Sequence, residues 1–192
     1  QFFLGLEGET DFLDLKRISS QTDKIELLKN SLSVVSLQKA NESAQKMFYI
    51  NAFNLRMIDL INQKQQGSNL ELITDIYDGE SFTVSKGQFT LRSLKHYLMV
   101  KYKDPKVLFA IYWGGNYAPQ LSAPPKKNYE KYLTQKMVRF LNDDGKVRVK
   151  EKSHKLVLPE FMKWCISDFG FEDPQQFIPF TNTVKQGNKV PS

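Results

Sequence analysis

The feature that most constrains the fold is residues 41–65, a segment whose pattern predicts a long helix. Its apolar residues recur at helical spacing but cover more than one face, so this helix is expected to be buried on several sides. Gly67 follows as an expected stop signal. Apolar residues make up 41% of the chain, with 14 Phe and 8 Tyr, so the core that such a helix requires is available.

Further patterns predict helices and two hairpins on either side of this segment. A short helix is expected near residues 12–18, and Asp23 has the capping-box spacing that opens a second helix. Thr90 is expected to cap a helix that ends before Asp104-Pro105, because the residue before a proline resists the helical region. The other expected elements are hairpins at 80–91, around a glycine loop, and at 146–158, a strand buried on both faces at 107–112, a helix from Tyr129 to Gly145 and a helix from Pro159 to Asp168.

These elements predict a single α+β domain, with helices packed on a small mixed or antiparallel sheet. We interpret residues 1–22 as an N-terminal arm, 23–180 as the domain and 181–192 as a flexible C-terminal tail. A length of 192 residues fits one domain with an extended arm. No run of about 18 uncharged apolar residues occurs, so no transmembrane segment is expected.

Charge and cysteine content restrict the functions open to the chain. The net charge is +6, and basic residues gather in 126–155, where they would suit acidic partners, anionic lipid or nucleic acid. Acidic residues interrupt that run, so a solvated surface is favoured over nucleic-acid binding. The single Cys165 excludes an internal disulfide, a cysteine-rich zinc site and a CxxC redox motif, and its apolar surroundings predict a buried side chain. Since no ligand spacing for a metal and no phosphate loop occurs, neither metal nor cofactor is expected.

Three short motifs follow one another in the order of a known family. They are Asn51-Ala52-Phe53-Asn54, Lys95-His96, and Asp104-Pro105-Lys106 followed by the loop Trp113-Gly114-Gly115-Asn116-Tyr117-Ala118-Pro119. This order resembles the bacterial and plant family called domain of unknown function 547. There the motifs read Asn-Ala-Tyr-Asn, Glu-His, Asp-Pro-Arg and Cys-Gly-Ser-x-Ser-Cys-Pro. The resemblance runs from about Ala44 to Gly170.

This chain lacks the two cysteines of the family pattern. Trp113 and Ala118 stand where the family has cysteines, and Lys95 stands where it has glutamate. The family's His and Cys motifs are similar to those of thiol hydrolases, which implies a fold of papain-like or transglutaminase-like type. In such enzymes imidazolium stabilises a reactive thiolate. Without the cysteines, the resemblance implies a pseudoenzyme.

Candidate site residues fall into two groups. His96, Asn51 and Asn54 are candidate catalytic remnants, and the two amides either anchor neighbouring loops or orient His96 or a ligand, because buried amides need hydrogen-bond partners. The predicted binding residues are Trp113, Gly114, Gly115, Asn116 and Tyr117, whose glycine amides are able to face a ligand and whose rings are typical binding anchors. The alternative is that Trp113 fills a lost cleft.

The leading hypothesis is a non-catalytic, exported protein, periplasmic or secreted, that binds another protein or a component of the cell envelope. Phe2, Phe3 and Leu4 are the predicted docking residues. Export is implied by the resemblance, and Gln1 is interpreted as the end left by removal of a signal peptide or by another cut. The alternatives are a hydrolase or transferase on peptide or acyl substrates that uses His96, with Cys165 or a serine as nucleophile, and binding of an anionic polymer or nucleic acid through residues 126–155.

Overall fold

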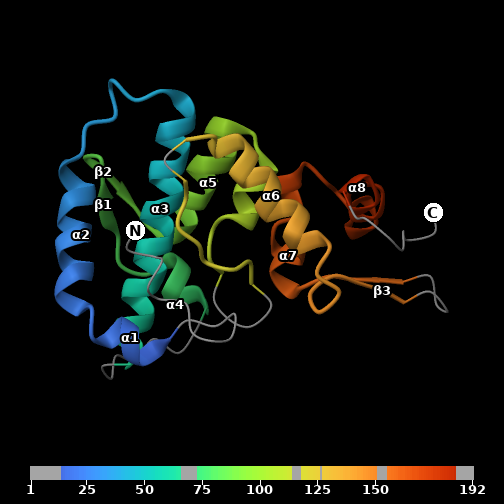
Figure 1. Cartoon of the computed structure of the whole chain (residues 1–192), viewed down its shortest axis with the longest axis horizontal. Coiled ribbons are helices and arrows are strands. Elements are labelled where there is room, and N and C mark those ends of the chain that lie inside the picture. Colours follow the sequence, from blue (N-terminus) through green and yellow to red (C-terminus); the bar gives the residue numbers. More distant parts are fainter. Residues whose placement is uncertain (1–13, 66–72, 114–117, 126, 151–154, 185–192) are drawn as a thin grey trace.

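The computed structural model describes residues 14–65, 73–113, 118–125, 127–150 and 155–184. They form one α+β domain in which helices predominate, as the sequence predicts (Figure 1). The strands form two separate antiparallel hairpins rather than one sheet. In chain order the first elements are α1 (Leu15–Ser19), α2 (Thr22–Val34), α3 (Glu42–Gln65), α4 (Ile73–Asp78), β1 (Phe82–Val84), β2 (Gly87–Phe89) and α5 (Leu91–Tyr102). They are followed by η2 (Pro105–Phe109), α6 (Tyr129–Leu141), β3 (Arg148–Lys150), β4 (Lys155–Val157), α7 (Glu160–Trp164), η4 (Ser167–Phe169), η5 (Pro174–Gln176) and α8 (Phe177–Val184).

The long helix α3 runs through the middle of the domain and packs against α1, α2, α5 and α6 (Figure 1). It starts after Asn41, whose side-chain oxygen accepts a hydrogen bond from the Ala44 amide at 2.9 Å. Ile50, Phe53 and Ile58 are almost completely buried although they point in different directions around the helix. The expected burial on several sides is therefore confirmed. The expected stop at Gly67 lies outside the described residues.

The first hairpin turns at Ser85-Lys86, not at the glycine that the sequence suggests. Both turn residues have positive φ, 49° and 69°, so they form the two-residue connection that matches strand twist. Gly87 is instead the first residue of β2, and a Cβ there would lie 2.8 Å from the Phe89 ring. The turn amides of Ser85 and Lys86 donate to the carbonyls of Leu32 and Ser33, which closes the C-terminal end of α2.

Helix starts agree with the sequence at α5 and differ at α2. Thr90 caps α5 through a capping box with Ser93, and Lys103 ends that helix in the left-handed region with φ 47°. The predicted cap at Asp23 is wrong, because α2 already begins at Thr22 and the Gln21 carbonyl accepts from Ile25. Asp23 therefore lies in the first turn, where its charge suits the helix dipole.

The predicted strand at 107–112 is wrong, although the burial it implied is correct. Pro105–Phe109 is a 3-10 helix whose first turn is capped by Asp104, which accepts from the Lys106 amide. Val107, Leu108 and Phe109 are fully buried. A buried apolar run does not distinguish a strand from a tight helix, and here no neighbouring strand of the described residues offers a ladder.

The part of the chain after α6 contains more regular structure than the sequence suggests. The second hairpin is confirmed, with Arg148 opposite Val157. The predicted helix from Pro159 to Asp168 breaks after Trp164, and η4 follows. Residues 174–184 form η5 and α8, and Thr181 is completely buried, so the predicted boundary between domain and tail at residue 180 falls inside α8. Residues 185–192 lie outside the described part.

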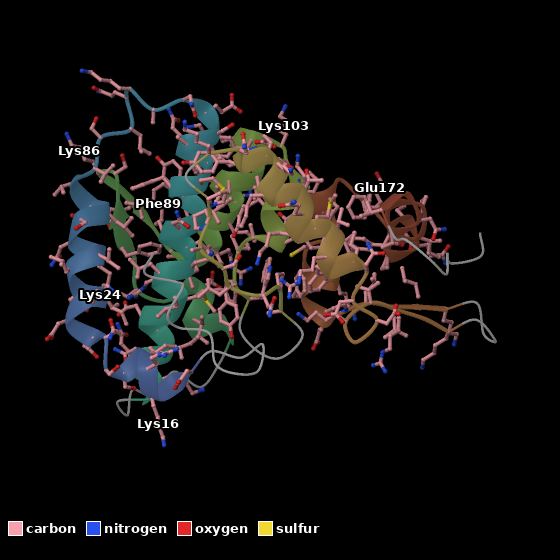
Figure 2. The ribbon with its side chains drawn as sticks, in the orientation of Figure 1. Lys16, Lys24, Lys86, Phe89, Lys103 and Glu172 are labelled. Atoms are coloured by element: carbon pink, nitrogen blue, oxygen red, sulfur yellow. The ribbon has the colours of Figure 1, made fainter. Side chains whose placement is uncertain are left out.

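The predicted N-terminal arm also overlaps the domain. Ile18 on α1 is fully buried in a cluster with Ile25 and Ile58, so residues 14–22 belong to the packed structure. Residues 1–13 lie outside the described part. Charged side chains such as Lys16 extend outward from the helices (Figure 2). None of the described helices combines the length and apolar character that crossing a membrane requires.

A buried lysine ties three elements together. The Lys46 ammonium on α3 lies 2.8 Å from Asp104 and 2.6 Å from Glu130 on α6, and Lys106 approaches Glu130 at 3.1 Å. Burial opposes the charge of Lys46, but the hydrogen bonds to the two carboxylates outweigh it and raise its pKa. The bond from Lys46 holds the pKa of Glu130 below its usual value.

Candidate functional site

Trp113, which the motif resemblance aligns with a cysteine, packs among aromatic rings. Its indole Nε1 donates a hydrogen bond to the Leu108 carbonyl at 2.9 Å, so the chain folds back on η2. The ring stacks on Phe161 of α7, with centroids 5.1 Å apart and planes 25° apart. Tyr77 of α4 lies 6.1 Å away on centroids. These contacts hold the half-buried indole in one orientation.

Lys95, which the motif resemblance aligns with a glutamate, also points toward this position. Its ammonium bonds to Asp168 of η4 at 2.7 Å, and the two side chains are only 15% and 12% exposed. The same ammonium lies 5.7 Å from the centroid of the Trp113 ring, which is cation–π distance. Trp113, Phe161, Tyr77, Lys95 and Asp168 are called the Trp113 cluster below.

Cys165 lies next to this cluster but is not accessible. It is completely buried, and burial raises the pKa of its thiol far above the ordinary value. The Lys95 ammonium opposes that rise and the Asp168 carboxylate adds to it. At neutral pH the group is therefore a neutral thiol, which is a poor nucleophile.

Tyr77 adds a buried hydroxyl to the same region. Its side chain is 8% exposed, and its hydroxyl has no hydrogen-bond partner among the described residues. Burial, together with the neighbouring Cys165, raises the pKa of Tyr77. The hydroxyl is thus a proton-bearing group, not a base.

The two candidate asparagines behave differently. Asn54 is buried, donates to the Ala110 carbonyl at 3.0 Å and accepts from the Tyr112 amide at 2.7 Å. These two hydrogen bonds hold the backbone just before Trp113. Asn54 therefore anchors the segment that leads to this residue. Asn51 is half-buried, and no hydrogen bond joins its side chain to another described residue. Asn54 is a positioning residue rather than a catalytic one.

His96 is not part of the Trp113 cluster. It is exposed on α5, whereas Lys95 points inward, because consecutive residues of a helix differ by about 100° in direction. No hydrogen bond among the described residues joins it to Cys165 or Trp113. Of the predicted binding loop, Trp113 is placed and Gly114, Gly115, Asn116 and Tyr117 lie outside the described residues.

The arrangement offers no reactive pair within the described part of the chain. The only cysteine is buried, the histidine at the family position points to solvent, and Ala118 is a buried methyl group. Those residues also contain no group of three or more His, Cys, Asp and Glu side chains that would hold a metal.

The basic run at 126–155 is partly engaged within the domain. Lys136 donates to the Gln120 carbonyl, and Lys146 lies 3.6 Å from Asp143. Glu130, inside the run, is committed to Lys46 and Lys106. Some of the basic side chains in this run therefore make contacts within the domain.

Sequence reasoning missed Asp168, Tyr77 and Phe161 as members of the cluster. The sequence contains one indication of Asp168: Lys95 replaces an expected glutamate, and a partly buried lysine needs a carboxylate partner. Asp168 is 73 positions further along the chain, so only the fold identifies it as the partner.

The comparisons with known proteins agree with the motifs. The family described as "Protein of unknown function, DUF547" matches residues 37–141, whereas the motif resemblance extended to about residue 170. Searches among curated proteins and among solved structures gave no match, and the papain-like or transglutaminase-like fold stays a prediction. Since the match covers more than half of the chain and includes α3, Lys95 and Trp113, this chain belongs to the DUF547 family.

Proposed function

We propose that this chain is a non-catalytic member of its family that binds another protein or a component of the cell envelope. One observation carries the proposal: a stacked indole and a lysine–aspartate pair occupy the positions where the family motifs have a cysteine and a glutamate. A stacked ring and a paired ammonium supply no nucleophile. They keep the scaffold folded and leave its surface for binding.

Hydrolysis or transfer through His96 is the less favoured alternative. It needs a nucleophile beside the imidazole, and Cys165 is a buried neutral thiol. Binding of nucleic acid through 126–155 is likewise less favoured, since Lys146 lies beside Asp143 and Lys136 is bonded to the Gln120 carbonyl.

Native purification from the source cells after mild crosslinking, followed by mass spectrometry, tests the proposal. We expect a companion in about the same molar amount and no turnover of peptide or acyl ester substrates. A chain recovered alone, with turnover that His96→Ala abolishes, would contradict the proposal.

Export belongs to the proposal and is supported by the family resemblance. Cell fractionation checks it: we expect the protein in the periplasmic or secreted fraction. Recovery with the cytosolic proteins would contradict export and binding in the cell envelope. It would not contradict binding of another protein.

A further inference from the structure

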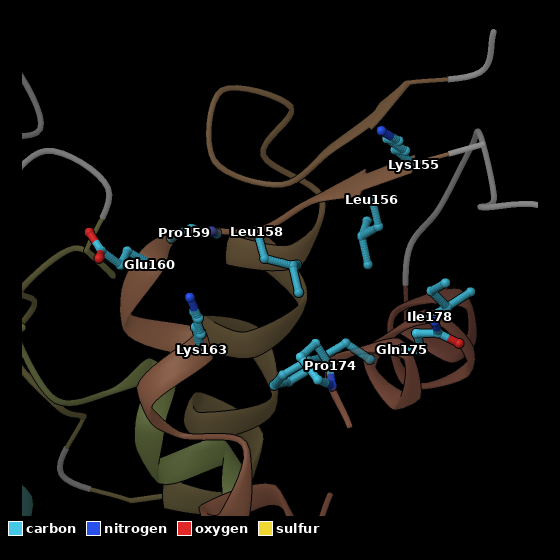
Figure 3. A pocket seen from close by; sticks show the side chains of 10 residues that line it. Lys155, Leu156, Leu158, Pro159, Glu160, Lys163, Pro174, Gln175 and Ile178 are labelled. Atoms are coloured by element: carbon cyan, nitrogen blue, oxygen red, sulfur yellow. The ribbon is translucent and has the colours of Figure 1, made fainter. Parts of the chain in front are cut away.

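A groove with a volume of about 880 Å³ opens between the β3–β4 hairpin and α8 (Figure 3). Its apolar lining comes from Leu156, Leu158, Pro159, Pro174, Phe177 and Ile178. It lies beyond residue 141, where the family match ends, so it belongs to a region that the family description does not cover.

Local structure explains why the groove is apolar. Leu156 and Leu158 are two positions apart on an extended chain, so their side chains project to one side. Figure 3 shows both pointing into the groove, toward Pro174. Ile178 lies on the opposite wall, on α8. All three large side chains are half-buried, so each leaves apolar surface facing the gap.

The rim of the groove carries charge. Lys155 and Lys163 lie near its two ends, and Glu160 is the one acidic side chain that lines it. An apolar floor with a predominantly cationic rim suits an extended peptide that has large apolar side chains next to acidic ones.

The chain itself contains such a peptide. Phe2, Phe3, Leu4 and Leu6 precede Glu7, Glu9 and Asp11, and residues 1–13 contain no Lys, Arg or His. The segment joins the domain next to α1, whereas the groove lies at the other end of the long axis (Figure 1). A second molecule can therefore offer its segment to the groove without that segment crossing its own domain.

We propose that the groove between β4 and α8 of one molecule binds residues 2–11 of a second copy of this chain. The inference rests on the proposed function, since it treats the chain as a binding protein, and adds self-association to the companion that native purification is expected to find. Because the two surfaces differ, the contact is head-to-tail and either closes into a ring or continues as a chain.

The primary experiment is sedimentation velocity of the full chain over a wide range of concentrations, together with fluorescence anisotropy of a labelled peptide of residues 1–13. We expect concentration-dependent association that the peptide competes away and that added salt weakens. Lys163→Glu at the exposed rim and Phe3→Ser in the segment should each weaken association at least about tenfold.

Matched variants separate the groove from general charge effects and from misfolding. Lys39→Glu makes the same charge change at an exposed position between α2 and α3 and should leave association unchanged. A peptide with Lys in place of Glu7, Glu9 and Asp11 should bind the Lys163→Glu protein better than the wild-type protein. Circular dichroism of each variant checks that the fold is kept.

A chain that stays monomeric and does not bind the peptide overturns the inference. Association that neither Lys163→Glu nor Phe3→Ser weakens also overturns it. Neither result touches the proposed function, since a monomer can still bind a different partner. Conversely, catalytic turnover would contradict the proposed function without changing the association measurement.

Discussion

The part of the domain up to α6 and the part after it are stabilised by different means. The first is built on α3, whose 24 residues pack against four other helices, and on the Lys46 ion pairs. In the second, no described element exceeds the eight residues of α8. Short helices are marginal by themselves, so this part depends on tertiary contacts between rings.

Within the second part, ring contacts gather around η4, η5 and α8. Phe169, Phe171, Phe177 and Phe180 contact one another with centroids between 4.9 and 6.4 Å apart. The family match ends where this second part begins, and the large groove lies within it. The matched part is thus dominated by helices, and aromatic packing holds the part after it in place.

Phe177→Ala should destabilise the part of the domain after α6. Phe177 is completely buried, and deleting such a side chain costs about 3–5 kcal/mol through lost transfer free energy and a cavity. Hydrogen exchange should accelerate mainly in 155–184. Phe53→Ala, at an equally buried site on α3, is the control and should accelerate exchange throughout the domain. Uniform acceleration in both variants would remove the distinction between the two parts.

Asn54 and Asn51 provide a matched pair within the first part. Asn54→Ala leaves the Ala110 carbonyl and the Tyr112 amide without their partner, so we expect a loss of about 2–4 kcal/mol in urea unfolding. Asn51→Ala should cost less than about 1 kcal/mol. Equal losses at the two positions would mean that Asn54 does not anchor the Trp113 segment.

The ion pair between Lys95 and Asp168 connects α5 in the first part to η4 in the second. A double-mutant cycle measures the energy of this contact. Lys95→Met and Asp168→Leu should each cost about 1–3 kcal/mol, because each leaves one charge poorly solvated. The double variant should be less destabilised than the sum of the single variants. Additive losses would show that the pair does not couple α5 to η4.

Lys46→Met should cost about 1–2 kcal/mol at neutral pH, because Glu130 is half-exposed and the mostly buried Asp104 keeps Lys106 as a partner at 3.6 Å. The pKa of Glu130 is lowered in the folded protein, so the stabilisation is complete above its ordinary pKa and is lost as pH falls through the lower folded value. The difference between wild-type and variant unfolding free energies should shrink on acidification. A difference independent of pH would exclude the ion pair as its source.

Much of the helical scaffold could be predicted from the sequence because its signals are local. Thr90 and Ser93 are three residues apart, and the apolar residues of α3 repeat along one segment. Where the structure differs, the deciding contact lies elsewhere in the chain. The buried run at Val107 forms η2 instead of a strand, and the carbonyl and amide that follow it are bonded by Asn54, more than fifty residues earlier.

The candidate site was less predictable for the same reason. The replacements at Lys95 and Trp113 are visible in the sequence, but Asp168, Phe161 and Tyr77 are brought to them only by packing. The predicted start of the tail at residue 181 falls inside α8, because the polar residues after Phe180 give no local sign of packing. Phe177 and Phe180 instead contact Phe169 and Phe171, which fixes α8 on the domain.

The reactivity of Cys165 tests most directly the proposal that this chain carries no reactive thiol. We expect the native protein at neutral pH to react with a disulfide reagent such as Ellman's reagent only as fast as it unfolds, and denatured protein to react at once with one equivalent. Rapid stoichiometric reaction of the folded protein, at a rate above that of a free thiol, would contradict the account and return Cys165 to consideration as a nucleophile.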